Sequence, residues 1–139
     1  MRALDLYPYG CTEQLTSRVL PMLYLDEIIL SAGLGEGPDV GERVAKAISG
    51  ILANQGSSGS FGLWAPGYGD LWLDSYVTDF LSRAAGKGQP VPAEALSLAL
   101  DNLANQVAYL PEKPDWASAA YAYYVLARNG RAAIGDLRY

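Results

Sequence analysis

Apolar and polar residues follow one another along most of the chain with the spacing of an α-helix. Apolar positions recur three and four residues apart, and no segment alternates with a period of two for long enough to indicate a sheet. Glycine and proline residues separate the helical stretches and mark their ends. The pattern therefore predicts an all-α fold built from helical hairpins.

The first third of the chain predicts one such hairpin. A first helix over about residues 13–32 contains Pro21, which must kink or divide it. A second helix is expected to begin at Asp39, whose side chain would cap free N–H groups, with Glu42 three positions on in a capping box. The apolar faces of the two helices are Leu15, Val19, Met22, Leu23 and Ile29 in the first, and Val44, Ile48, Ile51 and Leu52 in the second.

A glycine-rich segment over residues 54–70 follows and excludes a helix there. Its aromatic and aliphatic side chains indicate a packed loop, with room for a short hairpin, rather than a flexible linker. The side chains expected to be buried are Phe61, Leu63, Trp64 and Tyr68. The segment matches neither glycine-rich phosphate-binding motif.

Three further helices complete the pattern. The first spans residues 71–85, with Asp70 before it and Gly86 after it, and has the most regular apolar face, formed by Leu73, Tyr76, Val77, Phe80, Leu81 and Ala84. Pro90 and Pro92 introduce the second, which ends before Pro111 and buries Leu96, Ala99, Leu100, Leu103 and Val107. Asp115 caps the third, over residues 116–129, and residues 134–139 begin another element.

A weak internal repeat favours hairpins stacked in series. Residues 72–86 and 116–130 each run from a tryptophan to a glycine, and an aromatic residue follows each tryptophan at the same distance, at Phe80 and Tyr124. Four alanines would let neighbouring helices approach closely: Ala117, Ala119, Ala120 and Ala122. We therefore expect residues 1–139 to be one part of a larger αα-repeat or α/α toroid, with one apolar flank that favours self-association.

Composition narrows the possible functions. The 139 residues fit one domain, and the net charge of −5 with scattered basic residues makes nucleic acid an improbable partner. No apolar run approaches the roughly 20 residues of a membrane span, and residues 1–10 lack the core of a signal peptide. Without histidine the chain cannot form a Ser-His or Cys-His catalytic pair or a histidine metal site. We expect neither a metal nor a cofactor.

The candidate chemistry lies at the start of the first helix. Cys11 and Gln14 are three positions apart, which places their side chains on one face of a helix. Attack of a Cys11 thiolate on the Gln14 carboxamide, with loss of ammonia, would give an internal thioester, and Gly10 would give the backbone freedom for this ring. From the pattern alone, the alternative is that Cys11 is a small buried side chain and Gln14 a solvated one.

The whole segment changes the weight of these alternatives. Gly10, Cys11, Thr12, Glu13 and Gln14 form a Gly-Cys-x-Glu-Gln sequence, which resembles the thioester motif of the alpha-2-macroglobulin and complement family. Tyr7-Pro8-Tyr9 is similar to the bacterial branch of that family. The resemblance continues in residues 69–77, with Trp72-Leu73 and Tyr76-Val77, and in residues 120–128.

This resemblance implies both a fold and a role. The fold would be a six-hairpin α/α toroid of which the chain supplies about the first half, at the N-terminal side of a thioester domain. The role would be inhibition of proteases of many kinds: cleavage of a bait region elsewhere exposes the thioester, which then acylates a lysine amine of the protease. Cys11 would be the leaving group and Gln14 the acyl donor, so the protein reacts once rather than turning over as an enzyme.

The resemblance also assigns the neighbours of the bond and the partners. Glu13 matches the acid of the motif without an assignable role. Tyr7 and Tyr9 would either shield the thioester from water or pack as ordinary core aromatics. The stretch around residues 107–116 lacks the histidine that members preferring hydroxyl targets use, so direct attack by amines is expected. Other domains of a parent protein and a periplasmic or cell-envelope location are implied in the same way.

Two functions of other classes stay open on the sequence. An α/α-toroid enzyme would need an acidic cluster or metal site, and the nearest approach is Asp70, Asp74 and Asp79, which a helix disperses. A thioester adhesion module, or a scaffold with an inert Cys11, is the other. In the isolated chain we expect the Cys11 thiol to be free.

Overall fold

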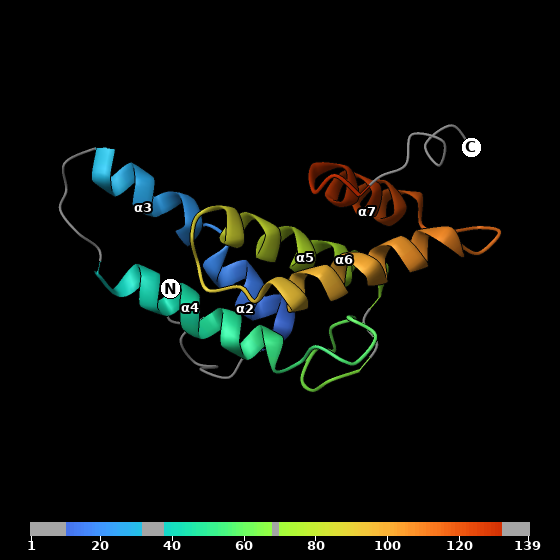
Figure 1. Ribbon diagram of the computed structural model, residues 1–139, viewed down its shortest axis with the longest axis horizontal. Coiled ribbons are helices and arrows are strands. Elements are labelled where there is room, and N and C mark those ends of the chain that lie inside the picture. Colours follow the sequence, from blue (N-terminus) through green and yellow to red (C-terminus); the bar gives the residue numbers. More distant parts are fainter. Residues whose placement is uncertain (1–10, 32–37, 68–69, 132–139) are drawn as a thin grey trace.

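The structure, a computed structural model, describes residues 11–31, 38–67 and 70–131 (Figure 1). These residues form helices and no strand, as the spacing of apolar residues predicts. The helices are α2 (Thr12–Val19), α3 (Met22–Ser31), α4 (Pro38–Leu52), α5 (Leu71–Gly86), α6 (Ala93–Ala108) and α7 (Trp116–Arg128). The predicted element at residues 134–139 lies outside the described residues.

The single helix expected over residues 13–32 is two helices, because Pro21 divides it. α2 ends at Val19, and α3 begins at Met22. A proline in a helix interior removes one backbone donor and clashes with the preceding turn. α2 packs on α4 and α5, whereas α3 lies along α4 (Figure 1). The first arm of the hairpin therefore consists of two helices that meet at Pro21.

The cap predicted for α4 is wrong. α4 begins at Pro38, so Asp39 lies inside its first turn and does not precede it. Proline suits the first helical position because its fixed φ matches the helix and its missing N–H would have no helical partner there. The capping box expected between Asp39 and Glu42 is therefore replaced by a start at proline.

The cap predicted for α7 is confirmed, and α5 begins with an N-cap of the same kind. The Asp70 carboxylate accepts a hydrogen bond from the Leu73 N–H at 2.7 Å. Asp115 accepts from the Ala117 N–H at 3.1 Å and from the Ser118 hydroxyl at 2.6 Å. Such bonds satisfy N–H groups that have no partner within the helix.

α5 occupies the middle of the molecule and packs on α2, α6 and α7 (Figure 1). Its predicted apolar face is buried, with Val77, Phe80 and Leu81 fully enclosed, while Tyr76 is only half-buried. The two apolar clusters that it borders also contain most of the other predicted core residues, namely Leu15, Val19, Leu23, Val44, Ile48, Ile51, Ala99, Leu100 and Leu103. The side chain of Ile29 lies outside the described part.

The segment after α4 is a packed loop, but of the three predicted anchors that the structure describes only Phe61 is buried. Phe61 has no exposed surface, whereas Leu63 is 45% and Trp64 67% exposed, so their predicted burial is wrong. Tyr68 lies outside the described residues. The loop turns back on itself through one antiparallel bridge between Gln55 and Phe61, too short to count as a hairpin.

Two glycines let this loop lie against other backbone. Gly59 has a φ of 93°, and a Cβ placed there would stand 2.2 Å from the Leu98 carbonyl oxygen in α6. A Cβ on Gly62 would stand 1.9 Å from the Ala65 carbonyl oxygen. No other residue type fits at either position without moving the backbone.

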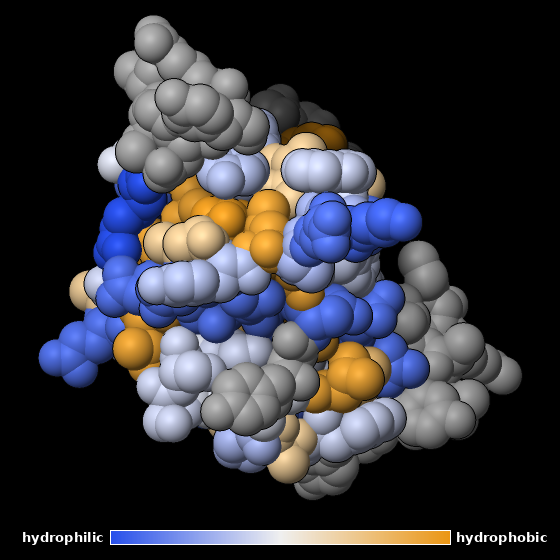
Figure 2. Space-filling view, turned by 90° about the vertical axis from the view of Figure 1, so that its right-hand side faces the viewer, coloured by the Kyte–Doolittle hydropathy of each residue, from blue (hydrophilic) through white to orange (hydrophobic). Residues whose placement is uncertain are grey.

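α5 and α7 contain the two copies of the predicted repeat, and they pack on one another. The paired aromatic positions differ, because Phe80 is fully buried and Tyr124 is 51% exposed. Of the four alanines that the sequence suggests for close packing, Ala119 and Ala122 are buried, and Ala117 and Ala120 are exposed. Figure 2 shows hydrophobic side chains between hydrophilic ones on the face that looks to the right in Figure 1.

Candidate reactive site

Cys11 and Gln14 come together at the N-terminus of α2. Cys11 is the N-cap residue, with extended backbone angles (φ −63°, ψ 165°), and its sulfur faces the backbone N–H of Gln14. The Gln14 side chain reaches back in turn, and its Oε1 accepts a hydrogen bond from the Cys11 N–H at 3.1 Å. The two residues therefore form a reciprocal capping box, the arrangement in which an N-cap side chain and the third helical residue contact each other's backbone.

This arrangement prepares the Gln14 carboxamide for attack. The Cys11 N–H donates to the oxygen that would carry negative charge if a nucleophile added to the carboxamide carbon. Cys11 is a free, half-buried thiol and Gln14 is exposed, so a reagent from solvent can reach both.

Thr12, between them, points into the protein instead. Its side chain has no exposed surface, and its hydroxyl donates to the Gly62 carbonyl oxygen at 2.5 Å. Its backbone N–H donates to the Leu63 carbonyl oxygen at 2.8 Å. The first turn of α2 is therefore tied to the loop after α4 through both side chain and backbone.

Asn54, just after α4, closes this connection from the other side. Its Nδ2 donates to the Thr12 hydroxyl oxygen at 2.9 Å, and its backbone oxygen accepts from the Gly62 N–H at 3.0 Å. One asparagine thus contacts both the helix that carries the site and the loop beneath it.

Asp74 of α5 anchors the same loop from inside the core. One carboxylate oxygen accepts from the Phe61 N–H at 2.8 Å, and the other accepts from the Ser60 hydroxyl at 2.8 Å. Asn102 and Gln106 of α6 donate to this second oxygen at 3.0 Å and 2.8 Å. Four donors compensate the loss of water around a carboxylate that has no exposed surface.

The other predicted residues add less. Glu13 is exposed in the first turn of α2, where the helix dipole favours an acid. Tyr7, Tyr9 and Gly10 lie outside the described residues. The pattern of the sequence does not reveal the contacts of Thr12, Asn54 and Asp74, because their partners are distant in the chain.

The acids considered for an enzyme do not gather in one site. Asp70 caps α5, and Asp74 and Asp79 are buried among separate partners. Across residues 11–31, 38–67 and 70–131, no group of three His, Cys, Asp or Glu side chains could hold a metal ion. No helix in the same part of the chain is long and apolar enough to span a membrane.

Comparison with known proteins identifies relatives over almost the whole chain. No family model matches the sequence. Alpha-2-macroglobulin of Escherichia coli strain K12 is 35% identical over 156 aligned residues, which cover 99% of this chain and 9% of the relative. The chain thus spans about a tenth of the length of this curated relative.

Solved structures agree with this relationship. The crystal structure of Salmonella alpha-2-macroglobulin reacted with methylamine matches 99% of this chain with a TM-score of 0.80 and 36% identity, over 10% of its own length. The crystal structure of trypsin-activated alpha-2-macroglobulin from Escherichia coli matches 95% of the chain with a TM-score of 0.81 and 33% identity, again over 10% of its length.

Proposed function

Because this chain is homologous over almost its full length to one segment of the bacterial alpha-2-macroglobulins, we propose that it carries the reactive site of a protease trap. In this proposal Cys11 and Gln14 form an internal thioester that acylates a lysine amine of the captured protease. The single observation that carries the proposal is the capping box, which holds the carboxamide of Gln14 against Cys11.

Formation of the thioester balances within these two residues. The Cys11 sulfur, as a thiolate, adds to the Gln14 carboxamide carbon, and the Cys11 N–H donates to the oxygen as it gains charge. The carbon–nitrogen bond then breaks, and the nitrogen leaves as ammonia after it takes up a proton from solvent. A carbon–sulfur bond replaces the carbon–nitrogen bond, and no oxidant or reductant is needed.

Capture of a protease forms a new amide at Gln14, with a lysine amine in place of the ammonia that was lost. A neutral lysine amine adds to the thioester carbon, the carbon–sulfur bond breaks, and the Cys11 thiol is released while Gln14 keeps an amide to the lysine. The absence of histidine from the sequence favours amines, which attack thioesters unaided, over hydroxyls, which need a general base. Each site reacts once, so the protein is not an enzyme.

The relatives support this chemistry and its targets. The Salmonella protein was reacted with methylamine, a small amine, and the Escherichia coli protein was activated by trypsin. By extension, we propose proteases as the targets of this protein, further domains of an alpha-2-macroglobulin as its immediate partners and the periplasm or cell envelope as its location. Residues 1–139 would be the N-terminal part of the thioester domain.

Intact-mass measurement on the full-length protein tests the proposal. The native protein should be lighter than its sequence mass by one ammonia, and methylamine should raise the mass by one methylamine while freeing Cys11 for alkylation. Cys11→Ala should keep its full sequence mass and should not react. A native protein with full mass and an alkylatable Cys11 under gentle handling would contradict a thioester.

Trypsin then separates a trap from an adhesion module. Limited digestion of the native protein should give a covalent adduct between Gln14 and a trypsin lysine, found by peptide mass spectrometry. A thioester that reacts with methylamine but never with an added protease would contradict the trapping role.

A further inference from the structure

Thr12 lies between Cys11 and Gln14 in the sequence but is more deeply buried than either. Cys11 is half-buried and Gln14 is exposed, while the Thr12 side chain is wholly enclosed. Its hydroxyl uses both of its capacities, because it donates to the Gly62 carbonyl oxygen at 2.5 Å and accepts from Asn54 Nδ2 at 2.9 Å. Only a hydroxyl can replace these two interactions in the same space.

The loop that receives these bonds is itself held in place. Asp74 accepts hydrogen bonds from Ser60 and Phe61, immediately before Gly62, and is fixed in turn by two side chains of α6. A fixed loop gives Thr12 a reference point, whereas a mobile one would follow the helix. The connection therefore runs from the core of α5 through the loop to the first turn of α2.

The N–H groups at the start of α2 bind two different acceptors, one in the loop after α4 and one in the Gln14 side chain. The Thr12 N–H donates to the Leu63 carbonyl oxygen, while the Cys11 N–H donates to Gln14. Unwinding of the first turn would break the contacts of Thr12 with Gly62 and Leu63 and would also move the Cys11 sulfur away from the Gln14 carboxamide. A misplacement of about 1 Å can slow a reaction between held groups by about 100-fold.

We propose that Thr12 is a positioning residue for the thioester, acting through Gly62, Leu63 and Asn54. Its hydroxyl holds the first turn of α2 in its helical conformation, which keeps Cys11 against Gln14. The proposal rests on the proposed function, since it concerns how readily that bond forms and persists.

Three variants of the full-length protein separate positioning from stability. Thr12→Val keeps the shape and removes the hydroxyl, and Thr12→Ser restores the hydroxyl. Thr16→Val is the matched control, because Thr16 is also fully buried in α2 but its hydroxyl donates only to the Thr12 carbonyl oxygen within the same helix at 2.8 Å. The readouts are the thioester fraction by intact mass, the rate of its reaction with methylamine and the thermal midpoint.

We expect Thr12→Val to lower the thioester fraction by about fivefold to tenfold, the effect of losing one or two hydrogen bonds. Thr12→Ser should recover most of the fraction, and Thr16→Val should lower the thermal midpoint while leaving the fraction near that of the native protein. A Thr12→Val protein with a native thioester fraction, or an equal loss in Thr16→Val, would overturn the proposal.

Asn54→Ala provides a second route if Thr12→Val does not fold. Asn54 is half-buried, so its truncation perturbs the core less, yet it removes the hydrogen bond that the Thr12 hydroxyl accepts. We expect a loss of the thioester fraction of about threefold, and an unchanged fraction would contradict the proposal. Absence of a thioester from the native protein would overturn the proposed function itself, which is a different outcome.

Discussion

Asp74 shows at the scale of one residue how a charge can be built into a small helical core. The carboxylate has no exposed surface, and each of its oxygens accepts at least one hydrogen bond. A buried charge is costly unless hydrogen bonds compensate it, and here they come from both a loop and a helix. The loop beneath the reactive site is thus part of the core.

Asp74→Ala should destabilise the protein by about 3 kcal/mol, because four donors would lose their acceptor in the interior. Asp74→Asn should cost less, since one oxygen remains. Asp101→Asn is the control, because Asp101 is exposed on α6 and pairs with Arg131 at the surface. Denaturant unfolding measures all three, and an Asp74→Ala protein as stable as Asp101→Asn would contradict this account.

The sequence predicts Cys11 and Gln14 as a pair because their interaction is local. A spacing of three on a helix is enough to bring them together, and the structure adds the capping box. Thr12 and Asp74 could not be found in this way. Their partners are separated from them by 50 and 14 positions for Gly62 and Ser60, and only the folded chain brings such positions together.

The elements themselves follow the same division between local and long-range information. The predicted cap at Asp115 is correct because capping depends on the residues of one turn. The predicted start of α4 is wrong for a reason that is also local, because Pro38 can begin a helix ahead of Asp39. The predicted burial of Leu63 and Trp64 is wrong because the packing of a loop depends on the elements around it.

The N-cap of α7 gives a prediction with a defined pH dependence. The hydrogen bond from the Ser118 hydroxyl lowers the pKa of Asp115 below its ordinary value of 3.8, with backbone N–H groups adding to the effect. A carboxyl whose pKa is lower in the folded state stabilises it fully above the unfolded pKa, and loses this contribution as the pH falls through the folded pKa.

The advantage of the native protein over Asp115→Asn should therefore be constant near neutral pH and should shrink once the pH falls below about 3.8. Thermal midpoints of the two proteins across this range measure it. The asparagine keeps an acceptor for the Ala117 N–H but cannot titrate. A difference between the two midpoints that did not change with pH would show that the charge of Asp115 contributes nothing.

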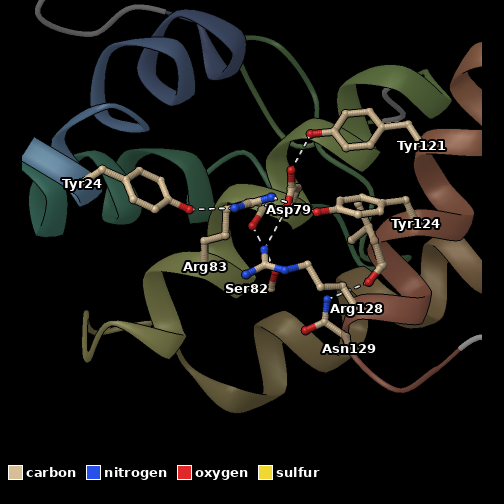
Figure 3. A network of polar contacts seen from close by, with 9 residues as sticks. Tyr24, Asp79, Ser82, Arg83, Tyr121, Tyr124, Arg128 and Asn129 are labelled. Carbon is tan, nitrogen blue, oxygen red and sulfur yellow. Dashed lines mark hydrogen bonds and ion pairs between the residues drawn. The ribbon is translucent and has the colours of Figure 1, made fainter.

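At the scale of the whole molecule, a second polar network joins three helices (Figure 3). Asp79 of α5 accepts from Arg83 at 2.8 Å and from the Tyr121 hydroxyl of α7 at 2.6 Å. Arg83 extends the network by donating to the Tyr24 hydroxyl of α3 at 2.7 Å and to that of Tyr124 at 3.2 Å. Burial raises the pKa of Tyr121, and its bond to Asp79 raises it further, so the phenol stays protonated as a donor.

Two tyrosines of α7 test whether this network holds the helix in place. Tyr121→Phe should cost about 1–2 kcal/mol, because it removes a bond to a buried charge. Tyr124→Phe should cost less than about 0.5 kcal/mol, because its hydroxyl meets Arg83 at an exposed position. Equal losses in chemical denaturation would show that α7 is held by its apolar face alone.

The interruption at Pro21 divides the first arm of the hairpin into α2 and α3. Hydrogen bonds along the helix axis would transmit a push on α3 directly to Cys11 if the helix were continuous, but α2 ends at Val19 and is fastened to the loop through Thr12. The two helices remain joined by the backbone through Leu20 and Pro21 and by the hydrogen bond from the Leu23 N–H to the Leu20 carbonyl oxygen at 3.2 Å. The break at the proline therefore gives the chain a point at which it can bend when α3 moves, ahead of the helix that carries the thiol.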